Sequence, residues 1–183
     1  SLIFNKKPFS LTFEVLSISV HKEVNKISRA LIKFLGGDSK LNTFEEADST
    51  FFKPDTEVEI KLGSDQSNTS VFKGIVEKNG ISILDGFQEF SSKRLLVIEC
   101  VDKAIEMTKT FTSDSYEGKK DSEVITTLVA KTGLKKTITA TTFKHSFLPK
   151  HNINDWDFIL QRASLNGLIV VNTDNEISVK EPV

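Results

Sequence analysis

The sequence predicts a mainly β protein of the α+β class, a small antiparallel barrel with two short packed helices. Three observations predict it. Apolar and polar residues alternate over about six short stretches before Asp102. Clusters of Gly, Asn, Asp and Ser separate these stretches, as expected for antiparallel strands. Two later segments instead have helical periodicity. We therefore predict a barrel domain at residues 1–107 and an α+β portion packed on it at residues 108–183.

The composition excludes several classes of partner. The 183 residues include 24 basic and 25 acidic side chains, and neither sign is concentrated in one segment, so no nucleic-acid surface is expected. The N-terminal stretch SLIFNKKPFSLTFEVL has no signal-peptide pattern, and no segment is apolar for long enough to span a bilayer. We expect a soluble protein that is cytoplasmic on synthesis.

The cysteine and the aromatic residues indicate a packed core rather than a reactive site. Cys100 is the single cysteine and lies in the apolar run LLVIECV, which predicts a buried free thiol. Fourteen phenylalanines accompany one tyrosine and one tryptophan. Because phenylalanine has no polar atom to satisfy, we expect these rings to fill the core.

The first strands follow from alternation. From Phe9 to Val15 every second residue is apolar, and the parity then shifts to Leu16, Ile18 and Val20. Such a shift predicts either a β-bulge or a strand that buries opposite faces in its two halves. Residues 30–35 suit a strand, or a short helix. Pro54 and Asp55 predict a turn before a strand at residues 57–62.

Glycines mark the next strands. The run VFKGIVEK is expected to form a hairpin with residues 57–62, and Gly74 within it indicates a bulge, a barrel corner or a close backbone approach. Asn79-Gly80 predicts a tight turn, after which residues 81–84 return as a short strand. RLLVIECV is the most apolar predicted strand.

Two helices are predicted after Met107. Asp121 is the expected N-cap of the first, whose apolar face precedes Gly133. Asn154 or Asp155 caps the second, which ends at Gly167. Its apolar stripe comprises Trp156, Ile159, Leu160 and Ala163, whereas Asp157, Gln161 and Arg162 are expected to face water. Threonine-rich residues 135–143 suit an extended strand, and residues 168–171 and 176–180 suit a final hairpin.

No catalytic, cofactor-binding or metal-binding residue is predicted. His145 and His151 lack the spacing and partner ligands of a metal site and are interpreted as solvated loop residues. Asp155 and Asp157 are better explained as helix-terminal acids than as a catalytic pair. The acidic residues Glu45, Glu46 and Asp48 suit a solvated loop, and Gly36-Gly37 suits a turn. We predict structural anchors at Gly74, Trp156 and Gly167, and no enzymatic activity.

Six segments, taken in order, resemble one family. They are VNKISRALIKFLGGDS, DSTFFKPDTEVEIKLG, VFKGIVEKNGI, LLVIECVDKAIEMT, KDSEVITTLVAKTGL and NDWDFILQRASLNGLIVV. Their order and spacing are similar to the N-terminal portion of VgrG proteins, including Rhs-element Vgr proteins, over nearly the whole chain. The family usually has glycine where Asp55 stands, a change that a turn tolerates.

The resemblance implies a structural role in a contractile injection machine. In that family the N-terminal region forms barrel domains of the phage-tail-hub type, trimerises and sits on a ring of the inner-tube protein Hcp. It continues into a C-terminal β-helical spike that meets effector or spike-tip proteins, whereas this chain ends at EPV, before any spike. The resemblance thus implies the hub of a type VI secretion spike, secreted as part of the apparatus.

Two other functions remain possible interpretations of the sequence. A hub of a phage tail or of an extracellular contractile injection particle is the main alternative, and an enzymatic effector or a lysozyme-type hub fits less well. Three-fold assembly needs complementary apolar surfaces between chains. We expect Leu16, Ile18 and Val20 to contribute to the trimer interface.

Overall fold

The chain folds into two compact units. The computed structural model describes residues 1–8, 14–35, 52–63, 69–84 and 93–182. One unit comprises Ser1–His21 and Arg29–Val101, and the other comprises Lys22–Ser28 and Asp102–Val183. The division therefore falls after Val101 rather than at residue 107, and the short segment 22–28 belongs to the second unit.

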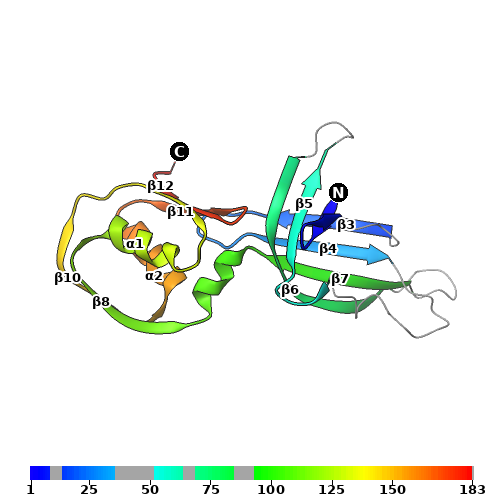
Figure 1. Ribbon diagram of the computed structural model, residues 1–183, viewed down its shortest axis with the longest axis horizontal. Coiled ribbons are helices and arrows are strands. Elements are labelled where there is room, and N and C mark those ends of the chain that lie inside the picture. Colours follow the sequence, from blue (N-terminus) through cyan, green and yellow to red (C-terminus); the bar gives the residue numbers. More distant parts are fainter. Residues whose placement is uncertain (9–13, 36–51, 64–68, 85–92, 183) are drawn as a thin grey trace. The chain divides into compact units, whose positions relative to one another are not determined.

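The first unit is a seven-stranded, fully antiparallel sheet with the strand order β2-β1-β5-β6-β7-β4-β3 (Figure 1). The antiparallel β class predicted from the sequence is confirmed. The strands are β1 (Leu2–Phe4), β2 (Lys7–Pro8), β3 (Glu14–His21), β4 (Arg29–Leu35), β5 (Glu57–Leu62), β6 (Thr69–Leu84) and β7 (Lys93–Val101).

The connection between the outer strands requires this sheet to curl. β2 and β3 lie at opposite ends of the strand order, and in a flat sheet they would be about 29 Å apart. The chain from Pro8 to Glu14 reaches at most about 21 Å. The outer strands must therefore approach each other, as in a barrel, although no ladder between described residues joins them. Figure 1 shows β5 crossing β3 and β4 steeply.

Phenylalanines fill the core of the first unit, as predicted. Phe4, Phe34, Phe52 and Phe72 are fully buried together with aliphatic residues from β4, β5 and β7. The rings of Phe4 and Phe52 meet edge to face, with centroids 5.5 Å apart. Cys100 is buried in the same cluster, which confirms the predicted buried thiol.

Gly74 lies where β6 changes partners. It pairs with Val58 of β5, and the next residue, Ile75, pairs with both Glu57 of β5 and Val101 of β7. A Cβ added at Gly74 would collide with the backbone carbonyl of Val101 and lie 2.8 Å from the Phe72 ring. Glycine is therefore required here by a close backbone approach at a corner of the sheet.

A β-bulge explains the parity shift in β3. The β3–β4 register slips between Val15 and Ser17, which makes Leu16 the extra residue. As a result Val15, Ile18 and Val20 all pack against the core, whereas Leu16 points outward. The alternative of a strand with two buried faces is wrong.

Some predictions for this unit are wrong, and others fall on residues outside the described part of the chain. The tight turn at Asn79-Gly80 and the separate strand at 81–84 are wrong, because β6 continues through both residues while pairing with β7. The Asn79 side chain instead donates a hydrogen bond of 2.9 Å to the Phe52 carbonyl. Residues 29–35 form strand β4, not a helix. The predicted Phe9–Phe13 alternation, Gly36-Gly37 and the acidic residues 45–48 lie outside the described residues.

The second unit packs two helices against a mixed sheet and a curved β-ribbon (Figure 1). The sheet has the order β11-β12-β9, and β8 pairs with β10 in the ribbon. The predicted pair of short helices is confirmed. The elements are the 3₁₀ helix η2 (Lys103–Thr108), β8 (Phe111–Lys120), α1 (Asp121–Ala130), β9 (Lys135–Ile138), β10 (Lys144–Asn154), α2 (Asp155–Leu165), β11 (Ile169–Thr173) and β12 (Glu176–Lys180).

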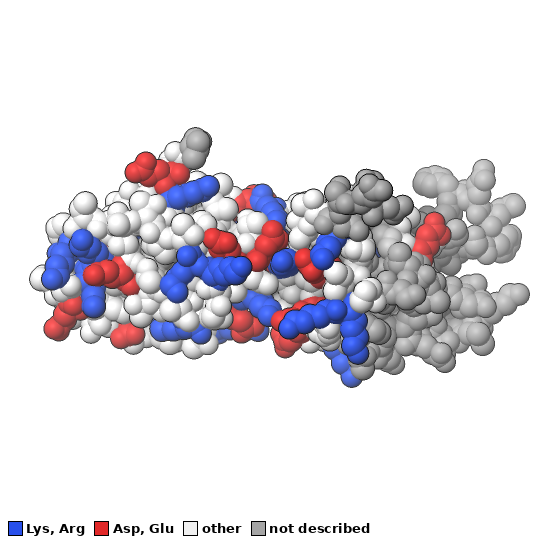
Figure 2. All heavy atoms as spheres, turned by 45° about the horizontal axis from the view of Figure 1, so that its top comes forward, with Lys and Arg blue, Asp and Glu red and all other residues white. Residues whose placement is uncertain are grey.

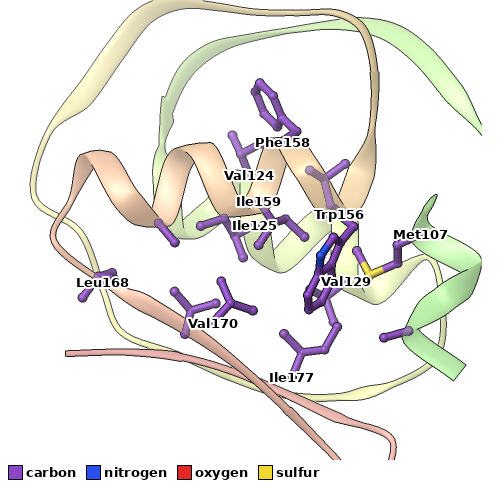
Figure 3. Close-up of a cluster of buried hydrophobic side chains, with 14 of the residues drawn as sticks. Met107, Val124, Ile125, Val129, Trp156, Phe158, Ile159, Leu168, Val170 and Ile177 are labelled. Carbon is purple, nitrogen blue, oxygen red and sulfur yellow. The ribbon is translucent and has the colours of Figure 1, made fainter. Parts of the chain in front are cut away.

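Helix α2 is buried on two sides. Trp156 and Ile159 lie in the main cluster, where Figure 3 shows Trp156 close to Met107 of η2 and to Ile177 of β12. Phe158, absent from the predicted stripe, is also buried and stacks on Tyr116 of β8 with ring centroids 6.4 Å apart. The ribbon therefore buries a second side of the helix, which periodicity alone did not reveal.

The ends of α2 follow the sequence signals. Asn154 is the N-cap, since its side-chain oxygen accepts a hydrogen bond of 2.8 Å from the Asp157 backbone N–H. At the other end Leu168 N–H bonds to Ala163 O at 2.9 Å and Gly167 N–H to Ser164 O at 3.0 Å, the two bonds of a Schellman motif. Gly167 has φ +68°, a conformation that glycine adopts without strain.

Replacing Gly167 with alanine is expected to destabilise the second unit by about 1 kcal/mol, because the left-handed conformation is unfavourable for a residue with a Cβ. An added Cβ would meet no atom, so backbone strain is the sole expected cause. Urea denaturation followed by the fluorescence of Trp156, the single tryptophan, measures the change. Exposed Ser164→Ala on the same helix is the control, and equal stability of the two variants would contradict the explanation.

Candidate functional site

The predicted interface residues lie on β3, which is at one end of the strand order of the first sheet. The three residues differ in exposure. Leu16 is 47% exposed, whereas Ile18 and Val20 are partly buried against the core. The outward apolar surface at this edge is therefore supplied by Leu16. Participation of the three residues in a trimer interface stays a prediction.

A cluster of buried polar side chains joins three elements of the second unit. Asp121 at the start of α1 accepts hydrogen bonds from Arg162 Nε at 2.6 Å and from Asn166 Nδ2 at 2.9 Å, both on or next to α2. His145 Nε2 from β10 lies 3.1 Å from the same carboxylate and 3.3 Å from Arg162 Nη2. The cluster fixes both helices and the ribbon to one carboxylate.

The cluster corrects three sequence predictions. Asp121 is not the N-cap of α1, because Lys120 holds that position. The Lys120 backbone N–H donates a hydrogen bond of 2.8 Å to Glu123 Oε2. Arg162 does not face water, and His145 is not a solvated loop residue, because their side chains are 14% and 16% exposed. The predictions for Arg162 and His145 failed because their partners are distant in sequence, so local spacing gave no signal for them. The N-cap of α1 was predicted one residue too late.

The electrostatics of the cluster stabilise the ionised carboxylate. Burial by itself raises the pKa of Asp121, but the hydrogen bonds from Arg162, Asn166 and His145 outweigh it and lower the pKa from 3.8 to about 2. The Asp121 side chain is only 3% exposed, and every donor around it belongs to the fold. A carboxylate held in this way is ionised at neutral pH and is a poor general base.

A second buried ion pair holds the start of α2. The Lys150 side chain is fully buried, and its ammonium lies 2.6 Å from Asp155 Oδ1 and bonds Thr112 Oγ1. Lys131 of the α1 terminus approaches the other Asp155 oxygen at 3.5 Å. Asp155 is therefore neutralised by lysines and does not form a catalytic pair with Asp157, whose carboxylate accepts a bond from Asn154 Nδ2 at 2.7 Å.

The described residues contain no recognisable metal centre. His151 is exposed on β10, and within residues 1–8, 14–35, 52–63, 69–84 and 93–182 no three His, Cys, Asp or Glu side chains group as metal ligands do. Burial raises the pKa of Cys100 to about 12, with a smaller contribution from Glu77. The thiol is therefore protonated and unreactive at neutral pH.

Charged side chains of both signs and several large apolar side chains share the surface of the described residues. On the face shown in Figure 2, lysines and arginines are interspersed with aspartates and glutamates rather than gathered in a patch of one sign. Large apolar side chains are also well exposed: Leu16, Leu62 and Ile81 in the first unit, and Val24, Phe111, Phe143, Phe147 and Leu165 in the second. No described helix is long and apolar enough to cross a membrane.

Comparison with solved structures shows that the fold is similar to those of phage tail proteins and of a type VI secretion component. A 43 kDa tail protein of prophage MuSo2 from Shewanella oneidensis superposes with a TM-score of 0.73 at 10% identity, over 98% of this chain and 52% of the other. An E. coli type VI secretion component, c3393, described as structurally similar to the T4 tail proteins gp27 and gp5, gives 0.65 at 11% identity, over 97% and 48%. The chain thus spans about half the length of these proteins.

A further match links the fold to a VgrG complex. A chain of the Francisella PdpA–VgrG complex superposes with a TM-score of 0.52 at 15% identity, over 93% of this chain and 25% of the other. At these identities the matches establish a shared tail-hub-like fold. They confirm the phage-tail-hub type of fold that the resemblance implied.

The family assignment comes from the sequence over its whole length. The family model of the Alg8 N-terminal domain matches residues 1–183, and the chain belongs to this family. No curated protein matches the chain. The family match does not confirm that the chain is a member of the VgrG family. What the chain shares with the VgrG complex is the fold.

Proposed function

We propose that this protein is a structural component of a contractile injection machine, the base of a type VI secretion spike of the VgrG kind. In this role the chain trimerises around the axis of the machine and sits on a ring of Hcp-like inner-tube protein. It is made in the cytoplasm and leaves the cell as part of the apparatus. Effector or spike-tip proteins attach through regions beyond these residues.

The superposition with tail and secretion proteins over nearly the whole chain is the observation that carries the proposal. The character of the described residues supports a mechanical role. Two of their buried charged side chains, Asp121 and Lys150, form ion pairs within the fold. We therefore propose no enzymatic activity. A cell-wall hydrolysis assay checks this, and activity lost on Asp155→Asn would overturn it.

The trimer interface is proposed to include the β3 edge at Leu16. Leu16→Lys is expected to weaken self-association at least tenfold, because a lysine at an apolar contact must be desolvated, while the monomer keeps its stability. Sedimentation velocity measures association, and urea denaturation measures stability. Ile18→Lys is unsuitable for this purpose, because Ile18 packs on the core and the substitution would unfold the first unit.

A matched control is Ser19→Lys, which places the same charge on an exposed residue of the same strand. The proposal expects Ser19→Lys to associate more strongly than Leu16→Lys. Unchanged association of Leu16→Lys would remove Leu16 from the interface. A trimer that survives this substitution would retain the hub proposal and move its interface elsewhere.

A hub of a phage tail or of an extracellular contractile particle is the second candidate function. The prophage tail protein from Shewanella oneidensis favours it, since it shares the fold over 98% of this chain. Both candidates predict a trimer on a tube. Co-sedimentation with an Hcp-like tube protein and, separately, with a phage-type tube protein distinguishes them. A secretion hub is expected to bind the first, and a phage or extracellular-particle hub the second.

A further inference from the structure

A seven-residue segment connects two strands of the first unit but folds with the second. Lys22–Ser28 follows β3 and precedes β4, which are neighbours in the first sheet. The backbone therefore passes between the units three times, after His21, after Ser28 and after Val101. We call residues 22–28 the strap. The second unit is discontinuous in sequence, because it contains the strap.

The strap bonds to the outer edge of β11. The Asn25 N–H donates to Val170 O at 2.7 Å, and the Val170 N–H donates to Asn25 Oδ1 at 2.9 Å. Asn25 thus satisfies both backbone groups of Val170, as a neighbouring strand would. It has φ +62°, a left-handed conformation that asparagine tolerates better than most residues.

A second reciprocal pair lies two residues further along β11. The Ser28 N–H donates to Asn172 Oδ1 at 2.9 Å, and Ser28 Oγ donates to Asn172 O at 2.6 Å. Both side chains are buried. Alternate residues of a strand direct their backbone groups to the same edge, so Val170 and Asn172 present one edge to the strap.

The strap is also tied to the core and to the following chain. Ile27 packs against the buried cluster of the second unit, and Ser28 O accepts a hydrogen bond of 2.9 Å from the Asp102 N–H. Lys22 forms an ion pair of 3.2 Å with Asp174 in the β11–β12 turn. Apolar packing, buried hydrogen bonds and an ion pair together hold seven residues in place.

We propose that the strap is a conformational device that completes the second unit. It seals the β11 edge, which would otherwise present unpaired backbone groups for pairing with another chain. It also makes the folding of the second unit depend on the β3–β4 connection of the first. Release of the strap opens the second unit while the first remains folded.

The Val170 amide gives a direct test by hydrogen exchange in the full chain. Asn25→Gly keeps the left-handed backbone accessible but removes the oxygen that binds the Val170 N–H. Exchange at Val170 is expected to accelerate roughly tenfold or more, because a buried hydrogen bond is lost. Asn25→Asp is the matched control, since it retains an oxygen at the same position and is expected to preserve protection. Equal protection of Val170 in both variants overturns the proposal.

A second measurement tests the coupling. In Asn25→Gly/Ser28→Ala, amides of α1 and α2 are expected to exchange faster, and the unfolding midpoint reported by Trp156 to fall. The slowest amides of β4 and β7 should keep their wild-type rates. Unchanged exchange rates in α1 and α2, or equal acceleration in both units, would contradict the proposed role of the strap. These results do not depend on self-association, so the hub proposal is tested separately.

Discussion

Replacing Gly74 with alanine is expected to destabilise the first unit by about 3 kcal/mol, among the largest effects of any single methyl group added to this chain. The added Cβ would collide with the Val101 carbonyl and the Phe72 ring. The Val101 carbonyl is part of the backbone of β7, so it moves only if the sheet corner moves. Urea denaturation followed by far-ultraviolet circular dichroism measures the loss.

Gly80→Ala is a matched control, because Gly80 lies on the same strand and a Cβ there meets no atom within 4 Å. It is expected to be neutral or slightly stabilising, since alanine restricts the unfolded chain. If Gly74→Ala were as stable as Gly80→Ala, the close approach of β6 and β7 at this corner would be disproved.

Replacing Asp121 with asparagine is expected to destabilise the second unit by about 3 kcal/mol. The substitution keeps the shape of the side chain but leaves the Arg162 guanidinium largely buried without its counter-charge. Trp156 fluorescence during urea denaturation reports the change. Glu106→Gln is the control, because the Glu106–Lys109 pair is exposed and such pairs contribute at most about 1 kcal/mol.

The same carboxylate predicts a pH dependence. Its pKa is about 2 in the folded protein and has an ordinary value of 3.8. The unfolded chain therefore takes up the proton first as the pH falls. The contribution of Asp121 to stability is present above about pH 4 and is lost as the pH approaches 2. Wild type and Asp121→Asn should converge in stability over this range, and a constant difference would contradict the assigned hydrogen bonds.

Strands were predictable where the spacing of their apolar residues matches the faces that they bury. β4, β5 and β7 each bury one face or both, so apolar residues recur with the period of a strand. The second helix was predictable from Asn154 and Gly167, whose local bonds cap it. The turn predicted at Asn79-Gly80 is wrong, because continuous pairing of β6 with β7 outweighs the turn propensity of these two residues.

The ribbon and the buried polar contacts were not predictable from one sequence. β10 contains Pro149 and few apolar residues, and its buried positions include Lys150, so it lacks an alternating pattern. Asp121 and Arg162 are 41 residues apart, and Asn25 and Val170 are 145 apart. Such pairs follow from topology rather than from local spacing. The outward position of Leu16 likewise depends on a bulge that the pattern left ambiguous.

The native mass of the protein tests the central claim most directly. The claim is that these residues assemble into a three-fold hub. Light scattering after size exclusion, over a wide range of concentrations, should give three times the chain mass of 20.4 kDa. A mass of one chain at every concentration would contradict self-assembly through these residues and would remove the support for a β3 interface.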